Sequence, residues 1–146
     1  MLKYVRYSDN IPEQFGGLAM AFIVTIRPKY KEDKGLHAHE FTHVDQFWSM
    51  SFLGLALLFA ILLLTDMLFV GYPLLIAAFG LHSDVYRVSS AYRFRSEVEA
   101  YINQLHAIGA TEVPYWTKNA LKNKYNLNIT DEQIDAAILP RITSPS

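Results

Sequence analysis

The sequence has 146 residues, of which 51% are apolar, 14% aromatic and 18% charged, with 13 basic and 14 acidic side chains. This length suits a single domain, 1–146, with a modest core, and the low charge argues against intrinsic disorder. A net charge near zero argues against nucleic-acid binding, which normally needs a basic excess. Cysteine is absent, which excludes disulfide scaffolds, thiolate metal sites and cysteine nucleophiles. The N-terminus has no apolar core of a signal peptide, so no secretory signal is predicted.

The first 35 residues are polar and mixed, apart from one apolar run over 18–26. This run follows a Gly-Gly pair, becomes β-branched toward its end and stops at an Arg-Pro pair, so it is predicted to be a strand. No Gly or Pro lies between Leu36 and Leu53, and the apolar residues there do not alternate strictly. We therefore predict a helix over 36–51 that begins near Gly35.

The stretch 52–81 is almost wholly apolar and carries a single charged side chain, Asp66. Its two legs, 52–65 and 67–81, are each too short to cross a hydrocarbon core of ~30 Å at 1.5 Å per residue. We interpret the stretch as an apolar helical hairpin inserted in the domain. It either enters a membrane or is buried as the only large core of a soluble domain. The turn is expected at Asp66 or at Gly71-Tyr72-Pro73.

The remaining third of the chain is polar and predicted to be helical. One helix is expected over 85–108, ending at Gly109. A C-terminal helical extension over 114–146 is expected to contain one helix from a Thr117 cap to Tyr125. A second begins at Thr130, which has capping-box spacing to a Gln, and ends before Pro140. The predicted fold class is α+β, mainly α, with a short sheet edge.

The strongest chemical signal is the H-E-x-x-H sequence formed by His39, Glu40 and His43. On a helix, residues i and i+4 lie on one face, so both imidazoles can bind the same ion. Glu40 is rotated by about 100° from His39, so its carboxylate can reach a metal-bound water without binding the metal. Zinc lowers the pKa of such a water toward ~7, and Glu40 would act as the general base.

A catalytic zinc site needs a third protein ligand. Gln46 and Ser49 occupy the positions at which a Gly and a further His would follow in a metzincin, and cysteine is absent. A later carboxylate must therefore complete the site. The segment around Glu97 and Glu99 offers two.

The sequence His39-Glu40-x-x-His43-x-x-Gln46, with Glu97-x-Glu99-Ala-Tyr later in the chain, resembles the small gluzincin metallopeptidases. The resemblance implies a zinc-dependent peptidase with His39, His43 and Glu97 as metal ligands. It favours Glu97 over Glu99 because the liganding Glu in such families stands three residues before a small Ala. It also implies a peptide or protein substrate, whose backbone would pair with an extended strand over 21–26 that lines the cleft.

Several neighbouring residues have a functional and a plain structural interpretation. His37 is either an auxiliary ligand or a surface residue, and lies about 200° from His39 on a helix. Asp45 and Gln46 either hydrogen-bond a liganding imidazole or face solvent, and Phe47 and Trp48 are expected in the core or at a membrane interface. Gluzincins tend to stabilise the oxyanion with Tyr, His or Arg, for which the candidates are Tyr86, Tyr92, Arg93, Tyr101 and His106.

If one zinc joins His39, His43 and Glu97, both flanks of the apolar stretch must lie on the same side of any membrane. Basic residues occur on both flanks, and the positive-inside rule places them together in the cytoplasm: Lys29, Lys31, Lys34, Arg87, Arg93 and Arg95. We therefore predict a membrane-associated protein with its zinc site on the cytoplasmic side and membrane contact through 52–81. The alternative is a soluble cytoplasmic protein.

Three functional hypotheses follow. The first is a zinc metallopeptidase with Glu40 as general base. The second is a non-catalytic, gluzincin-like structural or binding protein that is associated with a membrane or an assembly. The third is a helical membrane protein in which the H-E-x-x-H sequence is accidental.

Overall fold

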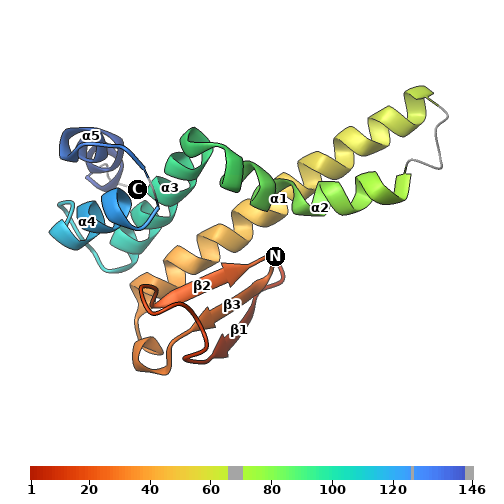
Figure 1. Ribbon diagram of the computed structural model, residues 1–146. Helices are drawn as coiled ribbons and strands as arrows, with labels where there is room; N and C mark the ends of the chain where they lie inside the picture. The colour runs from red at the N-terminus through yellow and green to blue at the C-terminus, as the bar shows by residue number, and fades with distance from the viewer. Residues whose placement is uncertain (66–70, 126, 144–146) are drawn as a thin grey trace.

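A computed structural model describes residues 1–65, 71–125 and 127–143 (Figure 1), and the side chains of these residues apart from 65 and 71–74. The described chain is mainly helical with one small sheet, which confirms the mainly-α α+β class. The sheet has the order β1-β3-β2, with β3 parallel to β1 and antiparallel to β2. Its strands are β1 Tyr4–Tyr7, β2 Gly17–Met20 and β3 Ile23–Ile26.

The predicted single strand over 18–26 is wrong, because the chain reverses direction within it. Ala21 has a φ of 54°, a left-handed conformation that L-residues adopt only in tight turns. β2 and β3 therefore form a hairpin, in which Gly17 pairs with Ile26 and Met20 with Ile23. As a result β3 is the central strand, and β2 is an edge strand with one free side.

Helix α1, Lys34–Thr65, begins one residue before the expected position. The side chain of Asp33 caps it by accepting a hydrogen bond from the backbone N–H of Leu36 at 2.9 Å. Nothing interrupts the helix where the apolar stretch begins, so α1 continues for 32 residues, which is about 48 Å at 1.5 Å per residue. Its first half contacts the sheet on one side and α3, Ser90–Ala107, on another.

Helix α2, Gly71–Val88, returns alongside the second half of α1, and the two form a hairpin that projects from the rest of the molecule (Figure 1). The helices approach closely at Gly54, where an added Cβ would lie 3.0 Å from the Cα of Ala78. The turn expected at Gly71-Tyr72-Pro73 is wrong, because these residues belong to α2. The alternative turn at Asp66 lies outside the described residues.

The helix predicted over 85–108 is interrupted at Ser89, which ends α2 and starts α3. The Ser89 side chain accepts a hydrogen bond from the backbone N–H of Tyr92 at 3.2 Å, as an N-cap does. α3 ends close to the expected place, and Gly109 follows it with a φ of 69°. The break lets α3 turn back along α1 and bring its buried face against the H-E-x-x-H motif.

Helices α4, Tyr115–Asn123, and α5, Asp131–Ile142, pack on α3. The Thr117 cap is wrong, because Pro114 occupies the N-cap position and Thr117 is buried within the helix. The capping box of Thr130 with Gln133 is confirmed. The predicted end of this helix before Pro140 is wrong, because α5 continues past Pro140 for two residues. A proline lacks only its own N–H donor to the carbonyl four residues earlier.

The buried core does not lie where the soluble interpretation placed it. One hydrophobic cluster joins α3, α4 and α5, and another joins the sheet to α1 around Val24, Ile26 and Val44. Neither cluster contains a described residue of 52–81, so the expectation that the hairpin is the only large core is wrong. Many hairpin side chains are exposed instead, among them Leu64 at 85% and Ile76 at 75%.

Candidate metal centre

The structure brings His39, His43 and Glu97 together. His39 Nε2 and His43 Nε2 lie 3.2 Å apart, because the two residues are one turn apart on α1. From α3, Glu97 Oε2 lies 3.6 Å from His39 Nε2, and Glu97 Oε1 lies 3.5 Å from His43 Nε2. These three residues form a group that could hold a metal ion.

The spacing of these atoms fits a small tetrahedral ion. Ligand atoms at 2.0–2.1 Å from a tetrahedral zinc lie about 3.3 Å from one another, and the two imidazole nitrogens are 3.2 Å apart. Each carboxylate oxygen of Glu97 lies 3.5–3.6 Å from a different one of these nitrogens, and one ligand atom from each residue lies within 4.8 Å of the other two. Glu97 is 1% exposed, and its Oε2 makes no hydrogen bond within the described residues. A buried carboxylate oxygen without a hydrogen-bond donor is costly, and a cation between these atoms would offset that cost.

Glu99, the alternative third ligand, does not reach the imidazole pair. Its side chain is exposed, and its Oε2 accepts a hydrogen bond from Gln46 Nε2 at 2.9 Å. Two residues along an α-helix correspond to about 200° of rotation, so Glu97 and Glu99 face different directions from α3. The expected preference for Glu97 therefore agrees with the arrangement.

Gln46 orients one of the two imidazoles. Its Oε1 lies 3.0 Å from His43 Nδ1, and its Nε2 donates to the backbone oxygen of Ser96 at 3.0 Å. When His43 Nδ1–H donates to this amide, its Nε2 presents a lone pair to the ion position. Of the two interpretations left open for Gln46, the structure shows the contact with the His43 imidazole. Asp45 is instead exposed to solvent and binds Lys3 Nζ at 2.7 Å.

Replacement of Gln46 by Ala is expected to weaken zinc binding by about 10- to 100-fold, the usual cost of removing a partner of a liganding His. Asp45→Ala is the matched control, since the neighbouring side chain contacts neither imidazole, and its zinc affinity should be unchanged. Competition with a chromophoric chelator measures both. Equal affinities in the two variants would remove Gln46 from the site.

Glu40 lies beside the imidazole pair, outside the group of three. It is 6% exposed and packs against Gly17 of β2, where an added Cβ would lie 2.7 Å from Glu40 Oε1. Burial raises the pKa of Glu40 above its ordinary value, although His39, His43 and a hydrogen bond to the Ala19 backbone pull this pKa down. Only a glycine at position 17 leaves room for this carboxylate.

The charges within the group are strongly coupled. Burial opposes ionisation of Glu97, but the imidazoles of His43 and His39 hold the pKa of this carboxyl well below its ordinary value. Burial also opposes a charge on His43, yet the carboxylates of Glu97 and Glu40 raise the pKa of His43 to about 9. The metal-free group therefore pairs a buried carboxylate with a proton on the imidazole pair. A metal cation would take the place of that positive charge.

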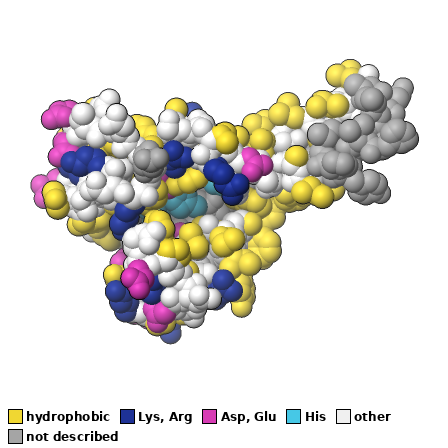
Figure 2. Space-filling view, viewed as in Figure 1, with side chains coloured by type: hydrophobic (Ala, Val, Ile, Leu, Met, Phe, Trp, Pro, Cys, Tyr) yellow, Lys and Arg dark blue, Asp and Glu magenta, His cyan; other side chains and the backbone are white. Residues whose placement is uncertain are grey.

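A cleft of about 580 Å³ opens beside His39 and Glu40. One wall is formed by the start of β2 and the segment before it, and the other by α3, α4 and the start of the α4–α5 connection. Figure 2 shows histidine at the base of a hollow between the sheet and these helices. Aromatic side chains contribute much of the lining: Phe15, Tyr30, Tyr101, Trp116 and Tyr125.

The strand beside the cleft is β2, so the expectation that 21–26 lines it is wrong. β3 has a partner on each side and has no free edge. Gly16 directs its carbonyl oxygen to β3, where it accepts from the backbone N–H of Arg27 at 2.9 Å. Backbone groups alternate in direction along an antiparallel strand, so those of Gly17 and Ala19 point away from β3.

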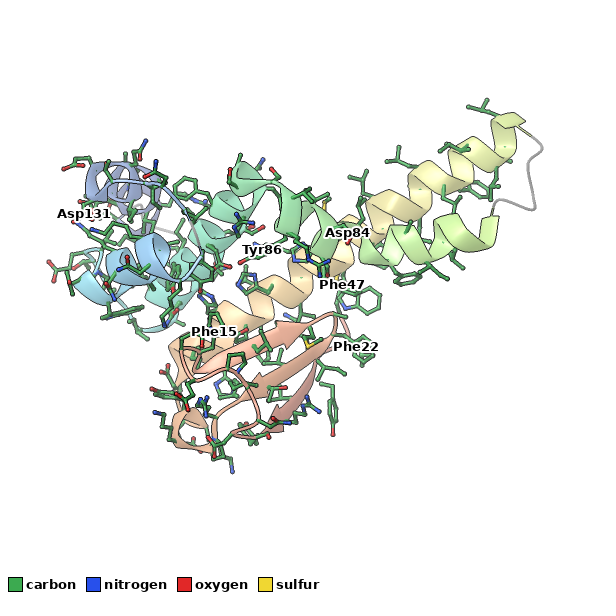
Figure 3. All side chains as sticks on the ribbon, viewed as in Figure 1. Phe15, Phe22, Phe47, Asp84, Tyr86 and Asp131 are labelled. Atoms are coloured by element: carbon green, nitrogen blue, oxygen red, sulfur yellow. The ribbon has the colours of Figure 1, made fainter. Side chains whose placement is uncertain are left out.

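Of the five oxyanion candidates, Tyr86 is the one whose side chain is hydrogen-bonded to a member of the group. Its hydroxyl donates to Glu97 Oε1, and its ring lies 6.4 Å from that of His43 (Figure 3). Burial and the neighbouring Glu97 raise the pKa of Tyr86, so this hydroxyl stays protonated and remains a donor. Tyr101 packs its ring against His39, with 4.5 Å between ring centroids.

The other expected residues have structural contacts elsewhere. Tyr92 binds His82 Nδ1, and His106 Nε2 lies 3.1 Å from the Arg141 backbone oxygen. Arg93 donates to the backbone oxygens of Tyr86, Arg87 and Tyr125, which secures the α2–α3 break. His37 Nδ1 lies 2.7 Å from the Asp33 backbone oxygen and is not part of the metal group.

Sequence reasoning missed two contributors to the site. Gly17 was interpreted only as a turn residue, although its lack of a side chain makes the space for Glu40. Asn103 donates to Thr42 Oγ1 at 2.9 Å and ties α3 to the motif helix. The Gly-Gly pair in the sequence was a signal for the role of Gly17. A single Asn on a predicted helix gives no comparable signal for Asn103.

No known protein family, curated protein or solved structure matches this chain. The function of this chain is therefore inferred from the geometry of its described residues. By length and composition, α1 contains a segment, Lys34–Leu64, that is apolar and long enough to cross a membrane. Such a helix is a weak sign of membrane association, because the core helix of a soluble protein and a signal sequence meet the same criteria.

Proposed function

We propose that this protein is a zinc-dependent peptidase of the gluzincin type. The observation that carries the proposal is the convergence of His39 Nε2, His43 Nε2 and the Glu97 carboxylate at 3.2–3.6 Å, with a second carboxylate, that of Glu40, buried beside them. Two His and one Glu form a zinc ligand set that leaves one coordination position free for catalysis. When bound, zinc supplies Lewis-acid polarisation and a water that ionises near neutral pH.

Glu40 is the proton acceptor in this proposal. It sits at the wall of the cleft, so it is available to substrate although its surroundings are largely dry. Its raised pKa makes it a stronger base than a solvated glutamate. The side chains of His39, His43 and Glu97 hold the ion, and Gln46 fixes the orientation of His43.

The free edge of β2 supports a polypeptide as the substrate. The backbone groups of Gly17 point outward beside Glu40, and the next outward-facing residue, Ala19, hydrogen-bonds to Glu40 through its backbone. An extended peptide can add to such an edge through main-chain hydrogen bonds, which hold the backbone in place without demanding a particular sequence. The aromatic lining of the cleft would then contact substrate side chains.

Tyr86→Phe is expected to lower kcat by about 10²–10³, the usual loss when one oxyanion donor is removed. The hydroxyl of Tyr86 lies at the metal group and stays protonated, so we assign it to the developing negative charge on the substrate oxygen. At saturating zinc KM should change little, while zinc affinity should fall as in Gln46→Ala, because the same hydroxyl donates to Glu97. Tyr92→Phe is the matched control, because its hydroxyl binds His82 outside the group. An equal loss in both variants would contradict the assignment.

Zinc content and peptide hydrolysis, measured on the same preparation, test the proposed function. We expect one zinc ion per chain and cleavage of members of a broad peptide library, with loss of both on chelation. A zinc-replete protein that cleaves no peptide would instead support the non-catalytic alternative. Absence of stoichiometric zinc would leave only a helical protein with an accidental motif.

We also propose that the α1–α2 hairpin enters a membrane, with the zinc site on the cytoplasmic side. Its exposed apolar residues on α1 are Phe52, Leu53, Leu57, Phe59, Ile61, Leu63 and Leu64. At about 100° per residue, these positions are spread over roughly half of the helix circumference, and α2 covers part of the remainder. A protein partner covers one face of a helix, whereas lipid covers every exposed side. Recovery in the soluble fraction without detergent would exclude this placement.

A further inference from the structure

The end of the sheet nearest the hairpin carries exposed apolar side chains that the proposed function does not use. Three of them are exposed by more than half: Met20 at 65%, Leu2 at 64% and Tyr4 at 59%. Phe22, at the turn between β2 and β3, is 36% exposed. These four residues and two aromatic residues of α1 form the interface patch: Leu2, Tyr4, Met20, Phe22, Trp48 and Phe52.

Three aromatic rings of the interface patch are in contact and join it to the base of the hairpin through Trp48, while Tyr4 and Met20 lie at the same end of the sheet. The Trp48 ring stacks on Phe22, with 6.4 Å between centroids, and on Phe52 at 5.9 Å. Its Nε1–H donates to the backbone oxygen of Leu2 at 3.1 Å. The backbone N–H of Tyr4 donates to the Phe22 oxygen at 2.8 Å. The patch is thus built from the turn, the first strand and α1.

The position of the interface patch relative to the hairpin is visible in two views. Figure 3 places Phe22 at the end of the sheet that faces the hairpin, below Phe47 of α1. In Figure 2 the hydrophobic colour passes from the hairpin onto the adjacent edge of the sheet. A bilayer that surrounds the hairpin would therefore meet the turn of β2 and β3 at its surface.

We propose that the interface patch lies in the headgroup region of the bilayer that holds the hairpin, as a second contact of this protein with lipid. The inference rests on the proposed membrane placement of the hairpin and adds a surface to it. Aromatic residues with a polar atom, such as Trp48 and Tyr4, favour the membrane–water interface, where one end of the ring is apolar and the other is wet. Met20 and Phe22 would contact the first part of the acyl chains.

This contact fixes the cleft near the lipid surface. Along β2, Gly17 precedes Met20 by three residues, which is about 10 Å at 3.3 Å per residue. Along α1, His43 precedes Trp48 by five residues, which is about 8 Å at 1.5 Å per residue. Two independent elements therefore place the metal group and Glu40 at similar short distances from the interface patch.

Fluorescence quenching by brominated lipid tests the inference without any measurement of activity. The chain contains two tryptophans, Trp48 in the patch and Trp116 in the cleft. Both are replaced by Phe, so that each variant carries a single tryptophan. In this tryptophan-free chain, Phe22→Trp places the only tryptophan at the turn between β2 and β3. Tyr7→Trp is the matched control, because Tyr7 is 44% exposed at the opposite end of the sheet, where it pairs with Ile26. Each full-length variant is reconstituted in phosphatidylcholine–phosphatidylglycerol vesicles with phosphatidylcholine brominated near the headgroup.

We expect the Phe22→Trp variant to lose most of its emission and to shift to the blue on reconstitution, while the Tyr7→Trp variant keeps its emission. If the protein is in the vesicles but neither tryptophan is quenched, the inference is wrong and the hairpin alone contacts lipid. Equal quenching of both also overturns it, because the sheet would then lie flat on the surface. Failure to enter vesicles at all overturns the membrane placement, and none of these results bears on zinc or hydrolysis.

Discussion

Glu40→Gln is expected to abolish peptide hydrolysis and to leave zinc binding intact. Removal of a general base costs about 10²–10⁴ in rate, and the buried amide cannot accept the proton that the carboxylate accepts. Glu40 is outside the group of His39, His43 and Glu97, so the ion should remain. Removing the charge of Glu40 also relieves its repulsion with Glu97. The substitution therefore leaves all three proposed ligands in place. Steady-state kinetics and metal analysis on one preparation measure both effects.

The control for this experiment is Glu112→Gln, an exposed glutamate that the cleft does not include. It should retain full activity and full zinc content. Wild-type activity in the Glu40→Gln variant would contradict the assignment of the general base. Loss of zinc in that variant would instead place Glu40 among the ligands.

Glu97→Gln is expected to lose stoichiometric zinc, whereas Glu99→Gln is expected to keep it. Glu97 is the only carboxylate in the group of three within the described residues, and its charge balances the cation. The loss should exceed the 10- to 100-fold effects of residues that only orient a ligand. Glu99 instead lies at the surface and accepts from Gln46, a bond that the Gln oxygen can also accept.

Calorimetric zinc titration of the two variants gives a comparison between neighbouring glutamates of one helix. Circular dichroism of both should match that of the parent, so that a loss of binding is not a loss of fold. If Glu99→Gln lost the ion and Glu97→Gln kept it, the third ligand would be misassigned. If both kept it, the imidazole pair would be binding zinc without either carboxylate.

The motif helix and the capping box could be predicted because their signals are local. His39 and His43 are four residues apart, so helical periodicity alone places them on one face. The capping box at Thr130 is similarly contained in four residues. The preference for Glu97 over Glu99 came from resemblance, and the structure explains it by the direction in which each side chain leaves α3.

The features that could not be predicted depend on contacts between distant segments. β1 forms only because Val5 and its neighbours pair with β3, about twenty residues later. The reversal at Ala21 is hidden, since alanine is not a typical residue at positive φ. The edge position of β2 depends on the pairing of β1 with β3 and on the chain reversal at Ala21. The assignment of 1–146 as a single domain remains a prediction.

X-ray absorption at the zinc edge tests the central claim most directly, because it reports the atoms around the ion itself. For the zinc-loaded protein, we predict two imidazole nitrogens and carboxylate or water oxygen at about 2.0–2.2 Å, and loss of the bound zinc in His43→Ala. A spectrum without imidazole scattering, or one that His43→Ala leaves unchanged, would mean that zinc is not held by His39, His43 and Glu97.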